Sequence, residues 1–295
     1  MIETYKPSGK FTPIFPLYLI GAFAVIIGLA WLYVRVLDWI PLIYISFLAT
    51  AAFGFGCAML LHLAVNVGKC RNVLLATLAG LLIGAGAIGA KHWMQYKYTL
   101  GEIAKIAATE NGGENVSADE VGQQITFPLY IDFRVKTGWS VGRRGSSGDI
   151  SGIFVYGVWL LEALVVLACC VVLPRGKAKE PFSESSDKWA DEETALLSYM
   201  VPEHLPVYED VETLDDVLDF PEPADNSPRS LIYKLNSVPG EDEEDSYLSV
   251  ISQHLSYDKE GKANTVDTNV FEFVPISAER RSELLACIAE FTGEV

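Results

Sequence analysis

Four long runs of apolar residues constrain the fold of this chain more than any other feature of its sequence. They cover Ile14–Val34, Ile40–Val65, Val73–Ala90 and Ile150–Leu173. A helix needs about 20 mostly apolar residues to cross the hydrocarbon core of a bilayer. The first run is longer than the apolar part of a signal peptide and leads into the second after a short turn. The sequence therefore predicts a multi-pass membrane protein with four transmembrane helices.

The expected helices divide the chain into five parts. Between the third and fourth helices, Thr99–Thr109 has the spacing of a short helix, and Ser117–Glu120 has that of a capping box. The five parts are three transmembrane helices in residues 1–90 (about 14–34, 40–65 and 73–90), an extracytoplasmic loop domain in 91–149, a fourth transmembrane helix in 150–174, an acidic connector in 175–228 and a cytosolic α+β domain in 229–295.

The C-terminal part changes its pattern along its length. The connector carries short helical patterns at Glu192–Met200 and Asp210–Phe220, separated by prolines. Beyond it, alternating and β-branched residues predict three strands, and Ser277 is suited to begin a final amphipathic helix. The expected strands lie at 231–235, 247–257 and 266–274, and the apolar stripe of the helix is Leu284, Leu285, Ile288 and Phe291. The expected fold class is an all-α membrane protein, a four-helix transmembrane bundle with a small soluble α+β C-terminal domain.

Charge separates the chain into two chemically different halves. Residues 1–175 carry 13 Lys/Arg and 10 Asp/Glu, whereas residues 176–295 carry 9 and 28, a net charge of −19. Such an acidic segment repels phosphate backbones and anionic headgroups. We therefore expect no nucleic-acid partner. The acidity predicts either a solvated surface that keeps the domain soluble or a surface that binds a basic protein.

The orientation in the membrane follows from the basic residues beside the spans. Their total is almost evenly divided between the two sides, so the count alone does not decide. The short loop between the second and third spans carries Lys69 and Arg71 with no acid, and Arg175, Lys177 and Lys179 follow the fourth span. This distribution favours both termini in the cytoplasm.

Two stretches resemble sequences of a known group. Thr137–Ala163, with its Thr-Gly-Trp-Ser-Val-Gly and Val-Trp-Leu-Leu-Glu-Ala strings, is similar to the entry to the last span in uncharacterised bacterial multi-pass inner-membrane proteins. Pro181–Trp189 resembles the segment that follows, where those proteins have cysteines in place of Ser183 and Ser186 and begin a zinc-ribbon-like C-terminal domain. Serine hydroxyls do not replace thiolates as structural zinc ligands. The resemblance implies a bacterial inner membrane and a degenerate, metal-free ribbon, and it implies no activity.

Two polar side chains inside the spans are candidate site residues. Glu162 lies among Val, Leu and Ala, where an ionised carboxylate costs at least about 2.5 kcal/mol, so it is not expected to face lipid. It is either a carboxyl that hydrogen-bonds inside the bundle and fixes its packing, or a site that handles protons or ions. His62 lies near the cytoplasmic end of the second span, and we interpret it as a hydrogen-bonded interfacial histidine.

Helix packing and metal binding give two further expectations. Ala76, Gly80 and Gly84 recur every four residues on the third span, and small residues at this spacing let another helix backbone approach closely. The face they form would pack either inside the bundle or against a second copy. The histidines are scattered over different segments and the cysteines form no disulfide framework, so no metal site and no cofactor are predicted.

The sequence favours a membrane-anchored interaction or assembly protein that presents its acidic cytosolic domain to another protein. Besides the lipid bilayer, the expected partners are a protein or further copies of the chain. The alternative is a small transporter or proton-coupled channel component that uses Glu162. We do not expect an enzyme, because no residue set in the sequence makes a complete catalytic constellation.

Overall fold

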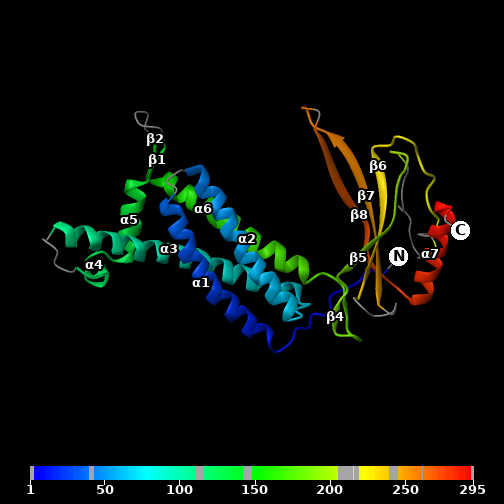
Figure 1. Ribbon diagram of the computed structural model, residues 1–295, viewed down its shortest axis with the longest axis horizontal. Helices are drawn as coiled ribbons and strands as arrows, with labels where there is room; N and C mark the ends of the chain where they lie inside the picture. The colour runs from blue at the N-terminus through cyan, green and yellow to red at the C-terminus, as the bar shows by residue number, and fades with distance from the viewer. Residues whose placement is uncertain are drawn as a thin grey trace. The chain divides into compact units, whose positions relative to one another are not determined.

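The computed structural model describes residues 3–39, 43–110, 116–141, 148–204, 215, 219–238, 245–260 and 262–293. The chain forms two compact units, one of residues 9–178 and one that combines residues 1–8 with 179–295 (Figure 1). We call them the bundle unit and the soluble unit. The chain passes from one to the other twice, after Ser8 and after Ala178.

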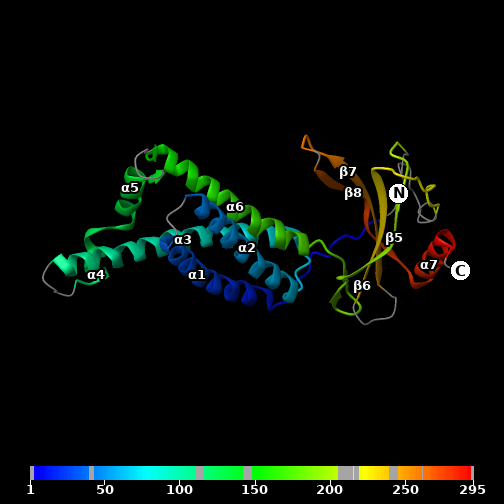
Figure 2. The same cartoon turned by 45° about the horizontal axis from the view of Figure 1, so that its top comes forward.

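The bundle unit is built on four helices that are long and apolar enough to cross a membrane. Helix α2 packs against α1 and α6, and α3 packs against α1 and α6 (Figure 2). Large apolar side chains on the outside of the helices are widely exposed, as expected of surfaces that face lipid; Leu82 and Ile153, for example, are 74% and 79% exposed. The four helices are α1 (Phe15–Trp39), α2 (Ile43–Val67), α3 (Val73–Glu110) and α6 (Ile153–Lys177).

Helix α3 is much longer than its apolar run. The sequence predicted a span that ends at Ala90 and a separate helix at Thr99–Thr109, but one continuous helix of 38 residues reaches Glu110. The prediction of two helices was wrong because polarity changes after Ala90 while the helix continues. No proline interrupts the segment, and Thr99 and Glu102, which have the spacing of a capping box, lie inside the helix, where the Thr99 hydroxyl donates to the Gln95 carbonyl.

The segment between α3 and α6 folds back along the end of α3. It contains α4 (Ala118–Gln124), α5 (Phe127–Thr137) and a short antiparallel pair, β1 (Trp139–Val141) and β2 (Gly148–Ile150). The predicted capping box is confirmed, since Ser117 and Glu120 exchange side-chain and backbone hydrogen bonds at the start of α4. Tyr96 and Leu100 of α3 form a buried cluster with side chains of α4 and α5.

The soluble unit is a four-stranded antiparallel sheet with one helix. The strand order is β5-β6-β7-β8, so each strand pairs with its neighbour in sequence. The core lies between β5, β6, β7 and the helix, where Tyr233 and Leu248 are fully buried with Leu284 of α7. The elements are β5 (Glu192–Met200), β6 (Arg229–Ser237), β7 (Ser246–Tyr257), β8 (Ala263–Ile276) and α7 (Ala278–Thr292), preceded by a small hairpin of β3 (Phe182–Ser183) and β4 (Lys188–Trp189).

The three strands predicted in the C-terminal domain are present as β6, β7 and β8, and Ser277 caps α7 through a hydrogen bond from the Arg280 amide. The helix predicted at Glu192–Met200 was wrong: this segment is β5, an edge strand of the same sheet. Its pairing with β6 outweighs a local pattern that also suits a helix. The helix expected at Asp210–Phe220 lies mostly outside the described residues.

The N-terminal residues contribute to the soluble unit. The Tyr5 amide donates to the Phe273 carbonyl of β8, and the Tyr5 ring packs edge-on against Tyr247 with centroids 5.4 Å apart. Ser8 donates a 2.6 Å hydrogen bond to Glu184. The sheet therefore depends on a segment more than 170 residues away in sequence, which the domain boundaries drawn from the sequence leave out.

Candidate functional site

Four polar side chains, one from each long helix, meet inside the bundle. The Lys91 ammonium of α3 lies 2.5 Å from the Glu162 carboxylate of α6. Thr50 of α2 reaches the other carboxylate oxygen at 3.4 Å and shares a 2.9 Å hydrogen bond with the Tyr33 hydroxyl of α1. The Lys91 nitrogen also lies 5.3 Å from the centre of the Tyr33 ring. We call these four residues the polar cluster.

The polar cluster is buried inside the bundle unit. Its side chains belong to residues that are between 1% and 6% exposed. The helix ends at Phe15, Val67, Val73 and Lys177 share one end of the bundle, because consecutive spans alternate in direction. At about 1.5 Å per residue, the four polar residues lie about 22–27 Å from that end. A hydrocarbon core is about 30 Å thick, so in a bilayer whose core began at these helix ends the polar cluster would lie in the far third.

Aromatic and basic side chains gather near the polar cluster at the same end of the bundle unit. The Arg35 guanidinium lies 4.8 Å from the ring centre of Tyr98 and 5.5 Å from that of Trp31. His92 packs against Trp159 with ring centres 5.0 Å apart. Such side chains place a polar edge at the headgroups and an apolar body in the hydrocarbon. These side chains lie within about two helical turns of the polar cluster along their helices.

The charges of the polar cluster cancel one another. A lone carboxylate or ammonium at this depth is costly, whereas a pair with good geometry regains most of its desolvation penalty. Glu162 accepts from both Lys91 and Thr50, and the Tyr33 ring adds a favourable contact to the ammonium. The pair joins α3 to α6, and the two hydroxyls extend the contact to α1 and α2. Chemically, the arrangement can hold four helices in register or pass a proton along a short polar chain.

Glu162 was predicted as a site residue from the sequence, but Lys91 was not. The prediction placed Lys91 in the loop outside the third span, because the apolar run ends at Ala90. The continuous helix turns this lysine into the bundle instead, where its residue is 5% exposed. One signal could have found it: an unaccompanied acid in a span calls for a cation near the same depth, and Lys91 is the lysine nearest to the end of an apolar run on that side.

The other predicted polar residue lies elsewhere. His62 is half-buried on α2, twelve residues from Thr50. Twelve residues correspond to about 18 Å along a helix, so the structure does not bring His62 to the polar cluster.

The predicted small residues of α3 lie at contacts within the bundle unit. A side chain at Gly80 would overlap the Cys170 carbonyl of α6, and one at Gly84 would come within 3.1 Å of Leu167. Ala76 is fully buried beside Phe15 and Ala178. The Gly80 and Gly84 positions thus allow α3 and α6 to approach closely enough for Lys91 to reach Glu162.

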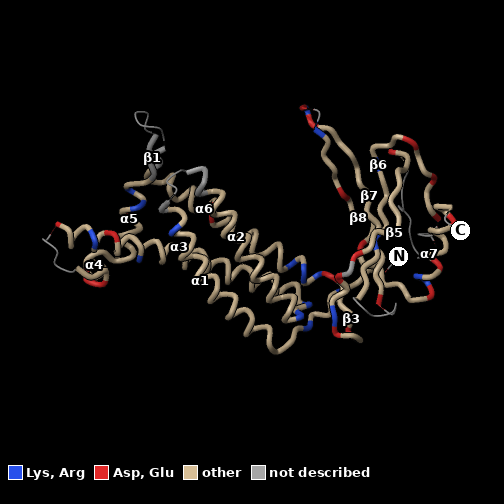
Figure 3. The backbone as a smooth tube through the Cα atoms, viewed as in Figure 1, with Lys and Arg blue, Asp and Glu red and all other residues tan. Residues whose placement is uncertain are grey.

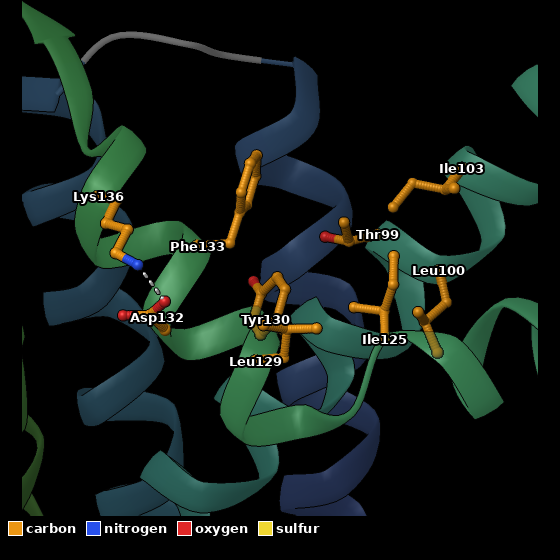
Figure 4. Close-up of a pocket in the computed structure, with 9 residues that line it drawn as sticks. All are labelled: Thr99, Leu100, Ile103, Ile125, Leu129, Tyr130, Asp132, Phe133 and Lys136. Carbon is orange, nitrogen blue, oxygen red and sulfur yellow. Dashed lines mark hydrogen bonds and ion pairs between the residues drawn. The ribbon is translucent and has the colours of Figure 1, made fainter.

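A groove lies outside the long apolar runs, between α3 and α5 (Figure 4). It is a groove of about 360 Å³ whose walls are mostly apolar. Its polar groups at one end are Asp132 and Lys136, which pair with each other at 2.7 Å. Burial raises the pKa of Tyr130 in its wall, against a smaller lowering by Arg134. The lining residues are Thr99, Leu100, Ile103, Ile125, Leu129, Tyr130, Asp132, Phe133 and Lys136.

The described part of the chain offers no group of three His, Cys, Asp or Glu side chains that could hold a metal ion. At the β3–β4 hairpin, where the resemblance placed a degenerate ribbon, Ser183 accepts hydrogen bonds from the amide and hydroxyl of Ser186 and donates to Asp245. Hydroxyl hydrogen bonds hold this turn together.

Comparisons with known protein families, curated proteins and solved structures find no match, so function has to be inferred from the residues themselves.

Proposed function

We propose that this chain is a membrane-anchored adaptor, in which the bundle unit is a fixed anchor and the soluble unit recognises another protein. The Lys91–Glu162 pair is the observation that carries this proposal. A paired and deeply buried carboxylate is neutralised within the bundle. It links all four long helices through Thr50 and Tyr33, as a structural lock would.

The soluble unit supports the same proposal by its charge. Acidic residues are frequent along it and charged residues are sparse along the spans (Figure 3). Residues 176–295 carry 28 Asp/Glu against 9 Lys/Arg. A field of this sign attracts basic surfaces and speeds their association. We place this unit in the cytoplasm of a bacterial cell, with both termini, since Lys69 and Arg71 flank the short loop on that side.

The polar cluster also supports a second candidate, a proton- or ion-coupled transport component. Its hydroxyls and charged groups form a continuous chain from Tyr33 through Thr50 to Glu162 and Lys91. Chains of this kind at membrane depth occur in pumps and transporters. The two candidates differ in whether the titratable groups are needed for function or only for packing.

A double substitution separates the two candidates. Lys91→Met with Glu162→Gln removes both charges and leaves neither ion alone in the bundle. The adaptor account predicts that this variant, produced at normal abundance, still recovers the same cross-linked partner from cells and still complements a deletion strain. A variant that is folded and abundant but fails to complement, while still binding its partner, would favour the transport candidate.

A second experiment changes the soluble unit in the full-length chain and leaves the polar cluster intact. Asp267→Lys and Glu272→Lys reverse exposed charges on β8 and do not touch the bundle unit. We expect them to reduce partner recovery and complementation while the abundance of the protein stays unchanged. Normal recovery and complementation with both reversals would count against recognition through this charge.

A further inference from the structure

Strand β8 is a long edge of the sheet in the soluble unit. It follows β7 at the end of the strand order, and no other described strand pairs with it. Its 14 residues run along β7 from Ile276 to Ala263, with two register shifts between Val274 and Asn269, whereas β6 pairs with β7 only as far as His254. The outer part of the β7–β8 ribbon therefore extends past the rest of the sheet, as Figures 1 and 2 both show.

The outer part of this edge, from residue 263 to 269, lacks the features that usually prevent a strand from pairing with another chain. Natural edges are blunted by shortness, by lysines, by proline or by β-bulges. The two register shifts of β8 against β7 lie between Asn269 and Val274, outside this part. Strand β8 is long, has no Lys or Arg, and has its proline at position 275, next to its end. Residues 263–269 are exposed, with Val266 54% exposed. Its charged residues are both acids, Asp267 and Glu272.

The ladder shows which backbone groups face the open side. The Leu255 amide of β7 donates to the Pro228 carbonyl, so Leu255 directs its backbone groups towards β6. In an antiparallel ladder, both groups of a residue point to one side, and successive residues alternate. The partners of Leu255 and Gln253 on β8 are Thr265 and Asp267. Thr265 and Asp267 therefore direct their N–H and C=O groups away from β7, towards the open edge.

An extended segment of this chain already uses the other end of the same edge. The Tyr5 amide donates a 2.8 Å hydrogen bond to the Phe273 carbonyl of β8. The contact is supported by the Tyr5 ring, which packs into a buried cluster with Tyr247 and Val238. The N-terminal segment thus makes one backbone hydrogen bond on the open side of β8, and the stretch from residue 263 to 269 lies beyond this contact.

We propose that the β8 edge binds an extended, basic segment of a partner protein as an added strand. The inference rests on the adaptor function and names the chemistry of the partner. Outward backbone groups at Thr265 and Asp267 would supply main-chain hydrogen bonds, as in other cases of strand addition. A lysine or arginine of the partner would lie opposite Asp267, where opposite charges across a strand pair are favourable. The net charge of −19 over residues 176–295 would draw such a segment towards the edge.

The test measures peptide binding to the full-length protein in phosphatidylcholine nanodiscs. The probe is a short fluorescein-labelled peptide of alternating lysine and valine. Its binding is measured by the rise in fluorescence anisotropy. A peptide with glutamate in place of lysine and nanodiscs without protein are the controls. We expect saturable binding of the lysine peptide that weakens with added salt, and no binding of the glutamate peptide.

Thr265→Pro tests strand addition itself. It removes an outward N–H and places a ring on the open side without removing a ladder bond, a position that edge strands tolerate. We expect about tenfold weaker binding, which corresponds to about 1.4 kcal/mol. Asp267→Lys should weaken binding about threefold, whereas Glu290→Lys on α7, with the same change in net charge, should not. Unchanged circular dichroism and melting temperature verify that each variant folds.

Two results would overturn the inference. Equal binding to wild type and Thr265→Pro would show that the peptide does not add as a strand. Absence of lysine-peptide binding, with the native partner still recovered from cells through the soluble unit, would reject the β8 edge and leave the adaptor function standing. If no partner protein is recovered from cells with the wild-type chain, the adaptor function is rejected, whether or not the lysine peptide binds.

Discussion

Removing one partner of the Lys91–Glu162 pair should cost far more than removing both. Coulomb's law at 2.5 Å, with an effective dielectric constant of about 20, gives a gross attraction of about 7 kcal/mol, which offsets the desolvation of two ions. Lys91→Met leaves Glu162 buried alone, and Glu162→Gln leaves Lys91 buried alone. Each single change should therefore lower the free energy of unfolding by about 3–5 kcal/mol. The double variant should lie within about 1–2 kcal/mol of wild type, since no ion is left without its partner.

The assay follows unfolding in detergent with a dye that fluoresces on reacting with thiols. Cys57, Cys70 and Cys170 are fully buried, so their reaction reports loss of bundle packing. Thr50→Val is the matched control: it removes a 3.4 Å contact to Glu162 and should cost less than about 1 kcal/mol beyond the loss of its bond to Tyr33. Single variants as stable as wild type, or a double variant no better than the worse single, would refute the reasoning.

Three further predictions address packing, pH and domain boundaries. Gly80→Ala should destabilise the bundle by about 1–3 kcal/mol in the same assay, because its methyl meets the Cys170 backbone, whereas Gly89→Ala on α3 meets open space and should be neutral or better. Burial, followed by the nearby acids and Tyr5, raises the pKa of Tyr247 to about 12. The folded state therefore holds this proton more tightly than the unfolded chain, and stability should fall as pH rises from about 10 to about 12. Denaturant titrations should show a smaller loss over this window for Tyr247→Phe than for wild type, and an unchanged loss for the exposed Tyr257→Phe. A fragment that starts near residue 225 lacks β5 and the N-terminal segment, and we expect size-exclusion chromatography to show aggregation; a monomeric, cooperatively unfolding fragment would show that neither is needed.

Local patterns in the sequence were enough to predict the long helices and three of the sheet strands. Apolar length alone placed the spans, since nothing but burial or lipid suits such runs. The capping signals at Ser117 and Ser277 were read correctly because a cap depends on residues three positions apart. Sequence periodicity failed at β5, whose conformation is set by pairing with β6 residues that lie 30 to 45 positions further along the chain.

The candidate site was only half predictable. Glu162 is conspicuous in an apolar run, but its partner Lys91 stands one residue beyond another run. Hydropathy assigns such a lysine to a loop, because it depends on local composition and not on the direction in which a side chain points. The hydroxyls of Tyr33 and Thr50 give no sequence signal at all, since Tyr and Thr are ordinary residues of membrane helices. Long-range geometry brings the four together.

The placement of the spans and of the soluble unit is tested most directly by labelling from outside the cell. Single cysteines at Thr109, at the end of α3, and at Ser282, on α7, are exposed positions in a cysteine-free chain. With both termini in the cytoplasm and α6 crossing the bilayer, an impermeant maleimide should label only Thr109→Cys in intact cells and both variants after permeabilisation. Labelling of Ser282→Cys alone in intact cells would invert the orientation, and labelling of both would contradict a membrane-spanning α6.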